Sequence, residues 1–268
     1  MNVLDQNIKD IIRDFPAVAD TLSAFGIACV TCNVGTCKLR DVVEIHNLPP
    51  DREQNLFDRV AAIVCPGTRV AISDAERKVR VSKGRKLSPP MQRLVEEHTY
   101  IKRVLALIPQ LTAGLDADLP ARKPLIEQVL GFIRGYADTY HHAKEEDILF
   151  GFFDPQTEVI VAFRQEHEVG RGHVRAAAEG LARGDAGAVA TNLRAYGELL
   201  AEHIRKEDDI LYPWIDQNLS DSAVGQLFSK FAEVDARFGD KPATFEAFVG
   251  RSEQDLARPA GAGRTQCR

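Results

Sequence analysis

Two segments of the chain repeat the same order of histidine and acidic residues. They read HHAKEEDILF at 141–150 and HIRKEDDILY at 203–212. In each segment a glutamate follows a histidine by four residues, which gives the pairs His141/Glu145 and His203/Glu207. Residues four apart lie on one face of an α-helix, so each pair directs an imidazole and a carboxylate to the same place. The repeat therefore predicts two metal half-sites.

Two further histidines complete the pattern. Each follows a glutamate directly, in VEEHTYIKR at His98 and in RQEHEVGRG at His167. The chain thus contains two similar halves, each with one lone histidine and one histidine/glutamate pair. Four imidazoles and two carboxylates suit two metal ions that share carboxylates, as in di-iron bundle proteins. Without thiolates this ligand set favours iron, while zinc, manganese and cobalt stay open on ligand type alone.

The elements that must position these residues are helices. Residues from about 91 to 237 have helical periodicity almost throughout, with His98, His167 and His203 on apolar stripes. Short connections make neighbouring helices antiparallel. The predicted fold class is therefore all-α: an up-down-up-down four-helix bundle preceded by a small helical N-terminal domain. The expected long helices span roughly 91–112, 121–153, 155–183 and 186–218, and a shorter one lies near 221–237.

The remaining histidines of this region are expected away from the metals. His142 directly follows His141, which places it about 100° further around an α-helix. That position favours the surface or a supporting role behind the ligands. His173 comes six residues after His167 and leaves the inward stripe.

Composition suggests four regions. Residues 1–64 form a small helical domain that contains cysteines, and the bundle occupies 91–240. Between them, 65–90 carries seven Arg/Lys against two acids and is read as a basic linker, or alternatively as a basic arm that touches a partner. Residues 241–268 have little to bury and are expected to form a mobile C-terminal tail.

Charge and hydropathy exclude some classes of protein. The net charge of -5 argues against nucleic acid as the main partner. The first residues, MNVLDQNIKD, lack the apolar segment of a secretory signal, and no apolar run reaches the ~18 residues of a membrane span. A cytoplasmic location is therefore expected. There the five cysteines are interpreted as thiols, metal ligands or redox groups.

Around its histidine and glutamate motifs the sequence resembles the hemerythrin-like (HHE cation-binding) domains, over about 91–218. Hemerythrins that carry dioxygen reversibly use five histidines and two carboxylates, with the fifth histidine four residues after the first on the third helix. Here that position is Arg171. Four histidines and two glutamates are similar instead to the RIC (repair of iron centres) proteins, cytoplasmic di-iron proteins made under nitric oxide and oxidative stress. This resemblance implies two non-haem iron ions with oxo and carboxylate bridges, held by His98, His141, Glu145, His167, His203 and Glu207.

The cysteines add a second, looser resemblance. RIC proteins have a small helical N-terminal domain with cysteines just after its second helix, and FPAVADTLSAFGIACVTC looks like that segment. Cys29, Cys32 and Cys37 are candidates for a redox thiol pair, a metal half-site or structural cysteines. With Cys65 they would offer four thiolates for an iron–sulfur cluster or zinc.

Three functions are compatible with these observations. The first is a di-iron protein of the nitrosative or oxidative stress response that binds or reduces NO or O2, or helps to repair iron–sulfur centres. The second is a sensor of O2, NO or redox state, or an oxygen-binding module. The third is an oxidase or peroxidase, so whether the protein is an enzyme stays open. The expected partners are diatomic ligands and damaged iron–sulfur proteins, neither nucleic acid nor membrane, and a homodimer stays open.

Overall fold

A computed structural model describes residues 3–27, 37–46, 48–67 and 86–257 of the chain. These residues form helices joined by short loops, and within the described ranges the extended pairing is limited to one isolated bridge between Asn7 and Lys38. The expected all-α fold class, a helical bundle preceded by additional N-terminal helices, is confirmed for these residues.

The N-terminal helices have an apolar core of their own. They are η1 (Val3–Asp5), α1 (Ile8–Asp14), α2 (Ala17–Ala24), α3 (Leu39–Ile45) and α4 (Pro50–Val64). The side chain of Asn7 caps α1 by accepting a hydrogen bond of 2.8 Å from the backbone N–H of Lys9. Ile8, Val18, Leu22 and Phe57 are fully buried in this core. The domain boundary expected near residue 64 stays a prediction.

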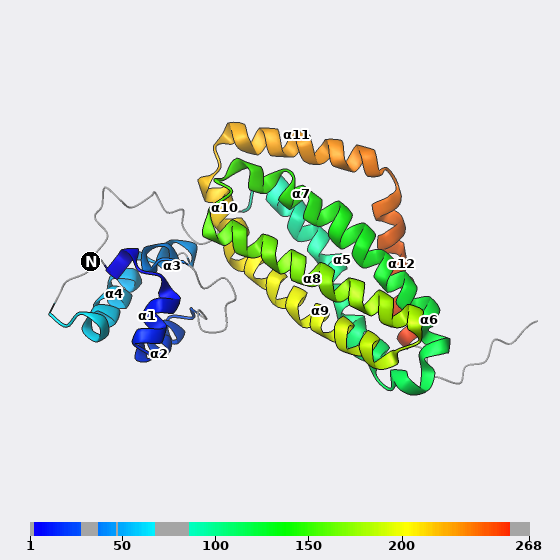
Figure 1. Ribbon diagram of the computed structural model, residues 1–268. Helices are drawn as coiled ribbons and strands as arrows, with labels where there is room; N and C mark the ends of the chain where they lie inside the picture. The colour runs from blue at the N-terminus through cyan, green and yellow to red at the C-terminus, as the bar shows by residue number, and fades with distance from the viewer. Residues whose placement is uncertain (1–2, 28–36, 47, 68–85, 258–268) are drawn as a thin grey trace, which may run out of the picture. The chain divides into compact units, whose positions relative to one another are not determined.

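The bundle is built from four helical rods (Figure 1). Two rods are single α-helices, and two begin as α-helices and continue through a segment of π-helix. The rods comprise α5 (Pro89–Thr112); α6 (Leu115–Phe132) with η2 (Ile133–His142) and α7 (Ala143–Glu146); α8 (Glu158–Arg183); and α9 (Ala186–Lys206) with η4 (Glu207–Leu211) and α10 (Tyr212–Asn218). A short 3₁₀ segment, η3 (Leu149–Phe152), follows the second rod.

Glycines at left-handed positions separate the rods. Gly114 has φ 63° just before α6, and Gly184 has φ 73° between α8 and α9. Glycine adopts positive φ without a steric penalty, so the chain can reverse there within a few residues. Apolar residues from the rods then meet in one core, which includes Val104, Leu193 and Tyr196.

The C-terminal segment corrects one expectation. Residues 241–257, expected to belong to a mobile tail, form helix α12 (Lys241–Ala257), which follows α11 (Asp221–Phe238). Val249 is fully buried, and the ring of Phe245 meets Phe132 edge-on with the centroids 5.9 Å apart. Arg103 of α5 donates hydrogen bonds of 2.8 and 2.7 Å to the carboxylate of Glu253. The sequence alone did not predict this helix, because the segment has few apolar residues. The aromatic side chains that they meet, such as Phe132, lie far away in the chain.

In the described part of the chain, no helix has both the length and the apolar character that crossing a bilayer requires.

Candidate metal centre

Seven buried side chains with metal-binding atoms gather in two groups. In each group, one possible ligand atom per residue lies within 4.8 Å of those of the other members. All seven residues are buried, with 5% or less of their surface exposed. The first group is His142, Glu145, His167 and His203, and the second is His98, His141 and Glu207. The six ligands expected from the sequence are all present in the groups, together with His142.

Carboxylates hold three of the imidazoles in one tautomer. The Nδ1–carboxylate distances are 2.9 Å for His141 and Glu97, 2.6 Å for His167 and Glu146, and 2.7 Å for His203 and Glu166. An ionised carboxylate can only accept, so Nδ1 of each ring is the donor. In a neutral ring this leaves Nε2 with a free lone pair, which is the usual arrangement behind a metal-binding histidine.

The Nε2 atoms face one another in pairs. They lie 2.9 Å apart in His98 and His141, and also 2.9 Å apart in His167 and His203. Since His167 and His203 both donate through Nδ1, their neutral rings direct two lone pairs at each other, an arrangement that a cation stabilises. Two nitrogen atoms that each lie about 2.1 Å from one metal ion, with a nitrogen–metal–nitrogen angle of about 90°, are about 3 Å apart. The donor atoms therefore fit a metal ion.

Glu145 lies close to imidazoles of both groups. Its Oε2 atom is 3.8 Å from Nε2 of His141 and 3.6 Å from Nε2 of His167. The side chain is fully buried, and a buried carboxylate is costly unless it is paired or bound to a metal. The position between the two groups suits a carboxylate that bridges two ions.

The π-helix explains why His142 joins the first group. The ring is 5% exposed and stacks on His167 with the centroids 3.9 Å apart and 12° between the planes. Because His142 ends the π-helical segment η2, its turn is wider than that of an α-helix. Successive residues are then separated by less than the 100° about the helix axis that an α-helix gives. Adjacent residues His141 and His142 can therefore both point inward, and a surface position for His142 is wrong.

The sequence did contain one signal for this difference. The first repeat begins His141-His142, whereas the second begins His203-Ile204. Ile204 is 1% exposed, so a buried apolar side chain stands where the first repeat has an imidazole. The second repeat also contains a π-helical segment, which begins at Glu207. Short π-helical segments within α-helices are frequent at functional sites.

Arg171 stands where oxygen carriers of the resembled family have a histidine, and it holds the surrounding carboxylates. Its guanidinium donates to Asp138 at 2.8 Å and to Glu146 and Glu168, both at 2.7 Å. Asp138 also lies 3.6 Å from Nδ1 of His142. Burial raises the pKa of the Asp138 carboxyl, but His142 and Arg171 outweigh this effect and hold its pKa below the ordinary value. Arg171 therefore holds Asp138 near His142 and Glu146 near His167.

A buried lysine supports the opposite carboxylate. Lys144 is fully buried and donates to Glu97 at 2.5 Å and to Asp235 of α11 at 2.7 Å. Burial raises the pKa of Glu97 above its ordinary value although the charges of Lys144 and Arg93 act to lower it. The carboxylate that orients His141 is thus connected to α11.

The other candidate residues lie outside the two groups. His173 is half-buried, and its Nδ1 lies 3.2 Å from Oδ1 of Asn192. Cys29 and Cys32 fall outside the described residues. Cys37 and Cys65 are half-buried thiols that pack against the N-terminal core, and neither forms a disulfide. Their expected redox or metal-binding role stays a prediction.

Comparison with known proteins agrees with this geometry. Residues 90–215 match the family model of the hemerythrin HHE cation binding domain, and this segment contains every member of both groups. The chain is 26% identical over 168 residues to "Uncharacterized protein Mb2018" of Mycobacterium bovis and to "Uncharacterized protein Rv1995" of Mycobacterium tuberculosis. These matches cover 59% of this chain and only 65% of either relative. No solved structure matches the chain.

Proposed function

We propose that the two groups hold a pair of non-haem iron ions. The observation that carries this proposal is the set of buried imidazoles whose Nδ1 atoms are held by carboxylates and whose Nε2 atoms face one another at 2.9 Å. Hydrogen bonds of this kind fix the tautomer of metal-binding histidines. The match to a cation-binding domain and the absence of thiolates from both groups favour iron among the transition metals.

The proposed ligands are the six expected from the sequence together with His142. Their full set is His98, His141, His142, Glu145, His167, His203 and Glu207. Glu145, which lies within 3.8 Å of imidazoles of both groups, is the proposed bridging carboxylate. The first group offers three imidazoles and the second offers two. The two iron ions would therefore have unequal surroundings.

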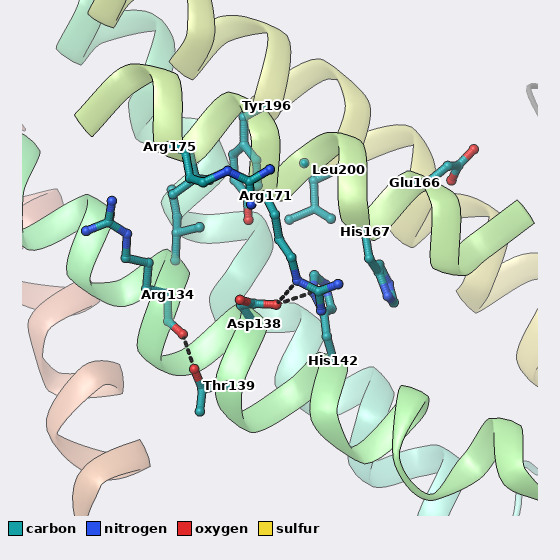
Figure 2. Close-up of a pocket in the computed structure, with 13 residues that line it drawn as sticks. Arg134, Asp138, Thr139, His142, Glu166, His167, Arg171, Arg175, Tyr196 and Leu200 are labelled. Atoms are coloured by element: carbon teal, nitrogen blue, oxygen red, sulfur yellow. Dashed lines mark hydrogen bonds and ion pairs between the residues drawn. The ribbon is translucent and has the colours of Figure 1, made fainter. Parts of the chain in front are cut away.

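We further propose that the protein acts in the response to nitrosative and oxidative stress, by binding or reducing NO or O2 or by helping to repair iron–sulfur centres. When bound, ferrous iron supplies the one-electron chemistry and the affinity for both diatomic ligands. The chain supplies an apolar surrounding, because Val174 and Leu200 line the same cavity as His142 and His167 (Figure 2). The resemblance to the RIC proteins supports a repair role for the N-terminal cysteines.

The ligand count favours a second candidate, an oxygen-binding module. With His142 the two groups contain five histidines and two glutamates, the same numbers that reversible oxygen carriers of the resembled family use. The fifth histidine comes from the end of η2, whereas Arg171 occupies the position expected on α8. The two candidates differ in what the ferrous protein does on meeting O2.

A single series of measurements distinguishes these possibilities. The protein is purified without oxygen, its iron is measured, and optical spectra are followed during addition of NO and, separately, of O2. We expect two iron ions per chain, an NO adduct, and oxidation by O2. An O2 adduct that is released under vacuum would favour the oxygen-binding module instead.

The repair role is tested separately. Cys29→Ser and Cys32→Ser should leave the iron content and spectrum unchanged but reduce the protection of iron–sulfur enzymes from NO. Normal protection by both variants would show that these thiols are not needed for repair.

A further inference from the structure

Three of the five tyrosines of the chain form a row in which neighbouring rings are in contact. The ring centroids of Tyr140 and Tyr136 are 5.4 Å apart, and those of Tyr136 and Tyr100 are 6.2 Å apart. Aromatic rings interact when their centroids are about 4.5–7 Å apart. Tyr140 and Tyr136 are 1% exposed, whereas Tyr100 is half-buried and has the guanidinium of Arg103 over its ring. The row therefore leads from the interior of the bundle to its surface.

The buried end of the row is connected to His141 through side chains. Nδ1 of His141 donates to one oxygen of Glu97 at 2.9 Å, and the other oxygen lies 3.4 Å from Nε of Arg93. Arg93 donates a hydrogen bond of 3.3 Å to the hydroxyl of Tyr140. Lys144, which donates to Glu97, lies over the ring of Tyr140 with Nζ 3.8 Å from the centroid. Since Tyr140 also directly precedes His141, it is close to the second group of proposed ligands.

The hydroxyls of the two buried tyrosines each donate to a carboxylate. Tyr140 donates to Asp235 at 2.6 Å, and Tyr136 donates to Glu246 at 3.3 Å. Packing alone does not require these hydroxyls, because Phe132 stacks on Tyr136 with the centroids 5.0 Å apart and has no hydroxyl. A tyrosine that loses one electron also releases its phenol proton. Each buried member of the row therefore has a proton acceptor in place.

The proposed function creates a need for electrons that the row can meet. Complete reduction of O2 to water consumes four electrons and four protons. Two ferrous ions supply two of these electrons when both become ferric. The other two electrons have to come from oxidisable side chains or from a reductant in solution, which cannot touch the buried ligands directly.

We propose that Tyr140, Tyr136 and Tyr100 carry electrons one at a time from the surface to the iron pair during the reduction of O2. This inference rests on the proposed iron site. Tyr140 gives an electron to the centre, and its phenol proton passes to Asp235. Tyr136 then restores Tyr140 with an electron, and Asp235 returns the proton. The phenol proton of Tyr136 passes to Glu246.

Tyr100 completes the transfer at the surface. It gives an electron to Tyr136, to which Glu246 returns the proton, and it releases its own phenol proton to water. A one-electron reductant in solution, of the ascorbate class, then gives Tyr100 an electron and a proton. Two such passages, together with the two electrons of the iron pair, complete the four electrons that O2 takes up, and the solvent supplies the protons.

Reaction of the reduced, iron-loaded protein with O2 in the presence of a nitroso spin trap tests the path. The trap reacts with a radical on the half-buried Tyr100, and peptide mass spectrometry measures the adduct. Tyr140→Phe and Tyr136→Phe should each lose most of the adduct, because phenylalanine keeps the ring but is not oxidised under conditions that oxidise tyrosine. All variants are first shown to hold the same amount of iron. An undiminished adduct on Tyr100 in both variants would overturn the proposal.

Substitution at the surface end distinguishes electron transfer from packing. After reaction with O2, ascorbate should remove the radical signal of the buried tyrosines, measured by electron paramagnetic resonance. Tyr100→Phe should slow this decay, and Tyr100→Trp should restore it, because the indole ring is also oxidised by one electron. Tyr212→Phe is the control, since this tyrosine belongs to α10 and lies outside the row. Equal decay in Tyr100→Phe and the unchanged protein would overturn the entry of electrons at Tyr100.

A measurement on metal-free protein keeps the electron path separate from the iron site. Aminotyrosine at the position of Tyr136 traps a radical with its own paramagnetic resonance spectrum, and burial protects this position from oxidants in solution. A photogenerated ruthenium(III) complex should produce that radical through Tyr100, and Tyr100→Phe should remove most of it. Failure to bind iron together with this result would overturn the iron site and support the path. Iron binding together with a trapped radical that does not depend on Tyr100 would overturn the path and leave the iron site standing.

Discussion

The chemistry of the proposed centre depends on carboxylates that do not belong to the two groups. Glu97, Glu146 and Glu166 each accept a hydrogen bond from Nδ1 of an imidazole. They fix the ring orientation and increase the electron density on Nε2, so their loss weakens metal binding without removing a ligand. None of the three was singled out as a partner of a particular imidazole from the sequence, because the contacts join residues 21 to 44 positions apart.

The contribution of Glu166 can be measured directly. Glu166→Gln keeps the size of the side chain but removes the negative charge that orients His203. We expect iron affinity to fall about 10- to 100-fold, measured by competition with a chelator. Glu179→Gln is the control, because this exposed glutamate lies outside both groups and pairs with Arg183 of its own helix. Equal affinity in both variants would contradict the proposed role.

His142 belongs to the first group of ligands, so its removal should affect one of the two iron ions. His142→Ala should reduce the iron content from about two ions per chain toward one, since His142 is one of four possible ligands in its group. His173→Ala should keep both ions, because His173 bonds to Asn192 and lies in neither group. Two ions and an unchanged optical spectrum in His142→Ala would remove His142 from the ligand set.

At the scale of the helix, the sequence predicted the elements but not their local winding. The three- and four-residue spacing of apolar and histidine positions was sufficient to place four rods and six candidate ligands on inward faces. The π-helical segments η2 and η4 carry no such signature, because they depend on hydrogen bonds five residues apart that tertiary packing selects. The assumption of a regular α-helix therefore predicted the correct side of the helix for His141 and the wrong side for His142.

The helical segments η2 and α12 pack closely at Gly135 and Phe245. A Cβ atom on Gly135 would collide with the ring of Phe245, whereas one on Gly131 would meet nothing within 4 Å. Gly131→Ala should raise the free energy of unfolding by about 0.5–1 kcal/mol, because alanine favours the helix. Gly135→Ala should lower it by about 1–3 kcal/mol through the overpacked contact. Thermal unfolding of both variants checks this, and an equal shift in both would contradict the packing of α12 on η2.

At the scale of the whole molecule, the bundle contains both groups of ligands, while the expected thiol chemistry lies in the N-terminal residues. A segment of residues 86–257, expressed alone, should fold and bind two iron ions, because α5 to α12 and all seven proposed ligands lie within it. Iron content and helical circular dichroism measure this. Failure of the segment to hold iron would show that the N-terminal residues are needed for the centre.

From the sequence, the bundle was expected to end near residue 240, whereas α12 continues to Ala257. The stability of the two possible segments can therefore be compared. A segment of residues 86–240 lacks α12 and leaves the partners of Phe245, Phe248 and Val249 exposed. Each such apolar side chain contributes about 1.5–3 kcal/mol when fully buried. We expect unfolding at a clearly lower temperature than for 86–257. Equal melting temperatures would mean that α12 adds no stability.

Mössbauer spectroscopy of the full chain, loaded with ⁵⁷Fe without oxygen, detects the proposed iron pair itself. The two groups of buried ligands differ by one imidazole, so we expect two iron ions per chain that give two distinguishable quadrupole doublets of equal area. Glu145→Ala, which removes the carboxylate close to both groups, should lose most of both signals. A protein that binds a single iron ion, or a Glu145→Ala variant with an unchanged spectrum, would contradict the proposed iron pair.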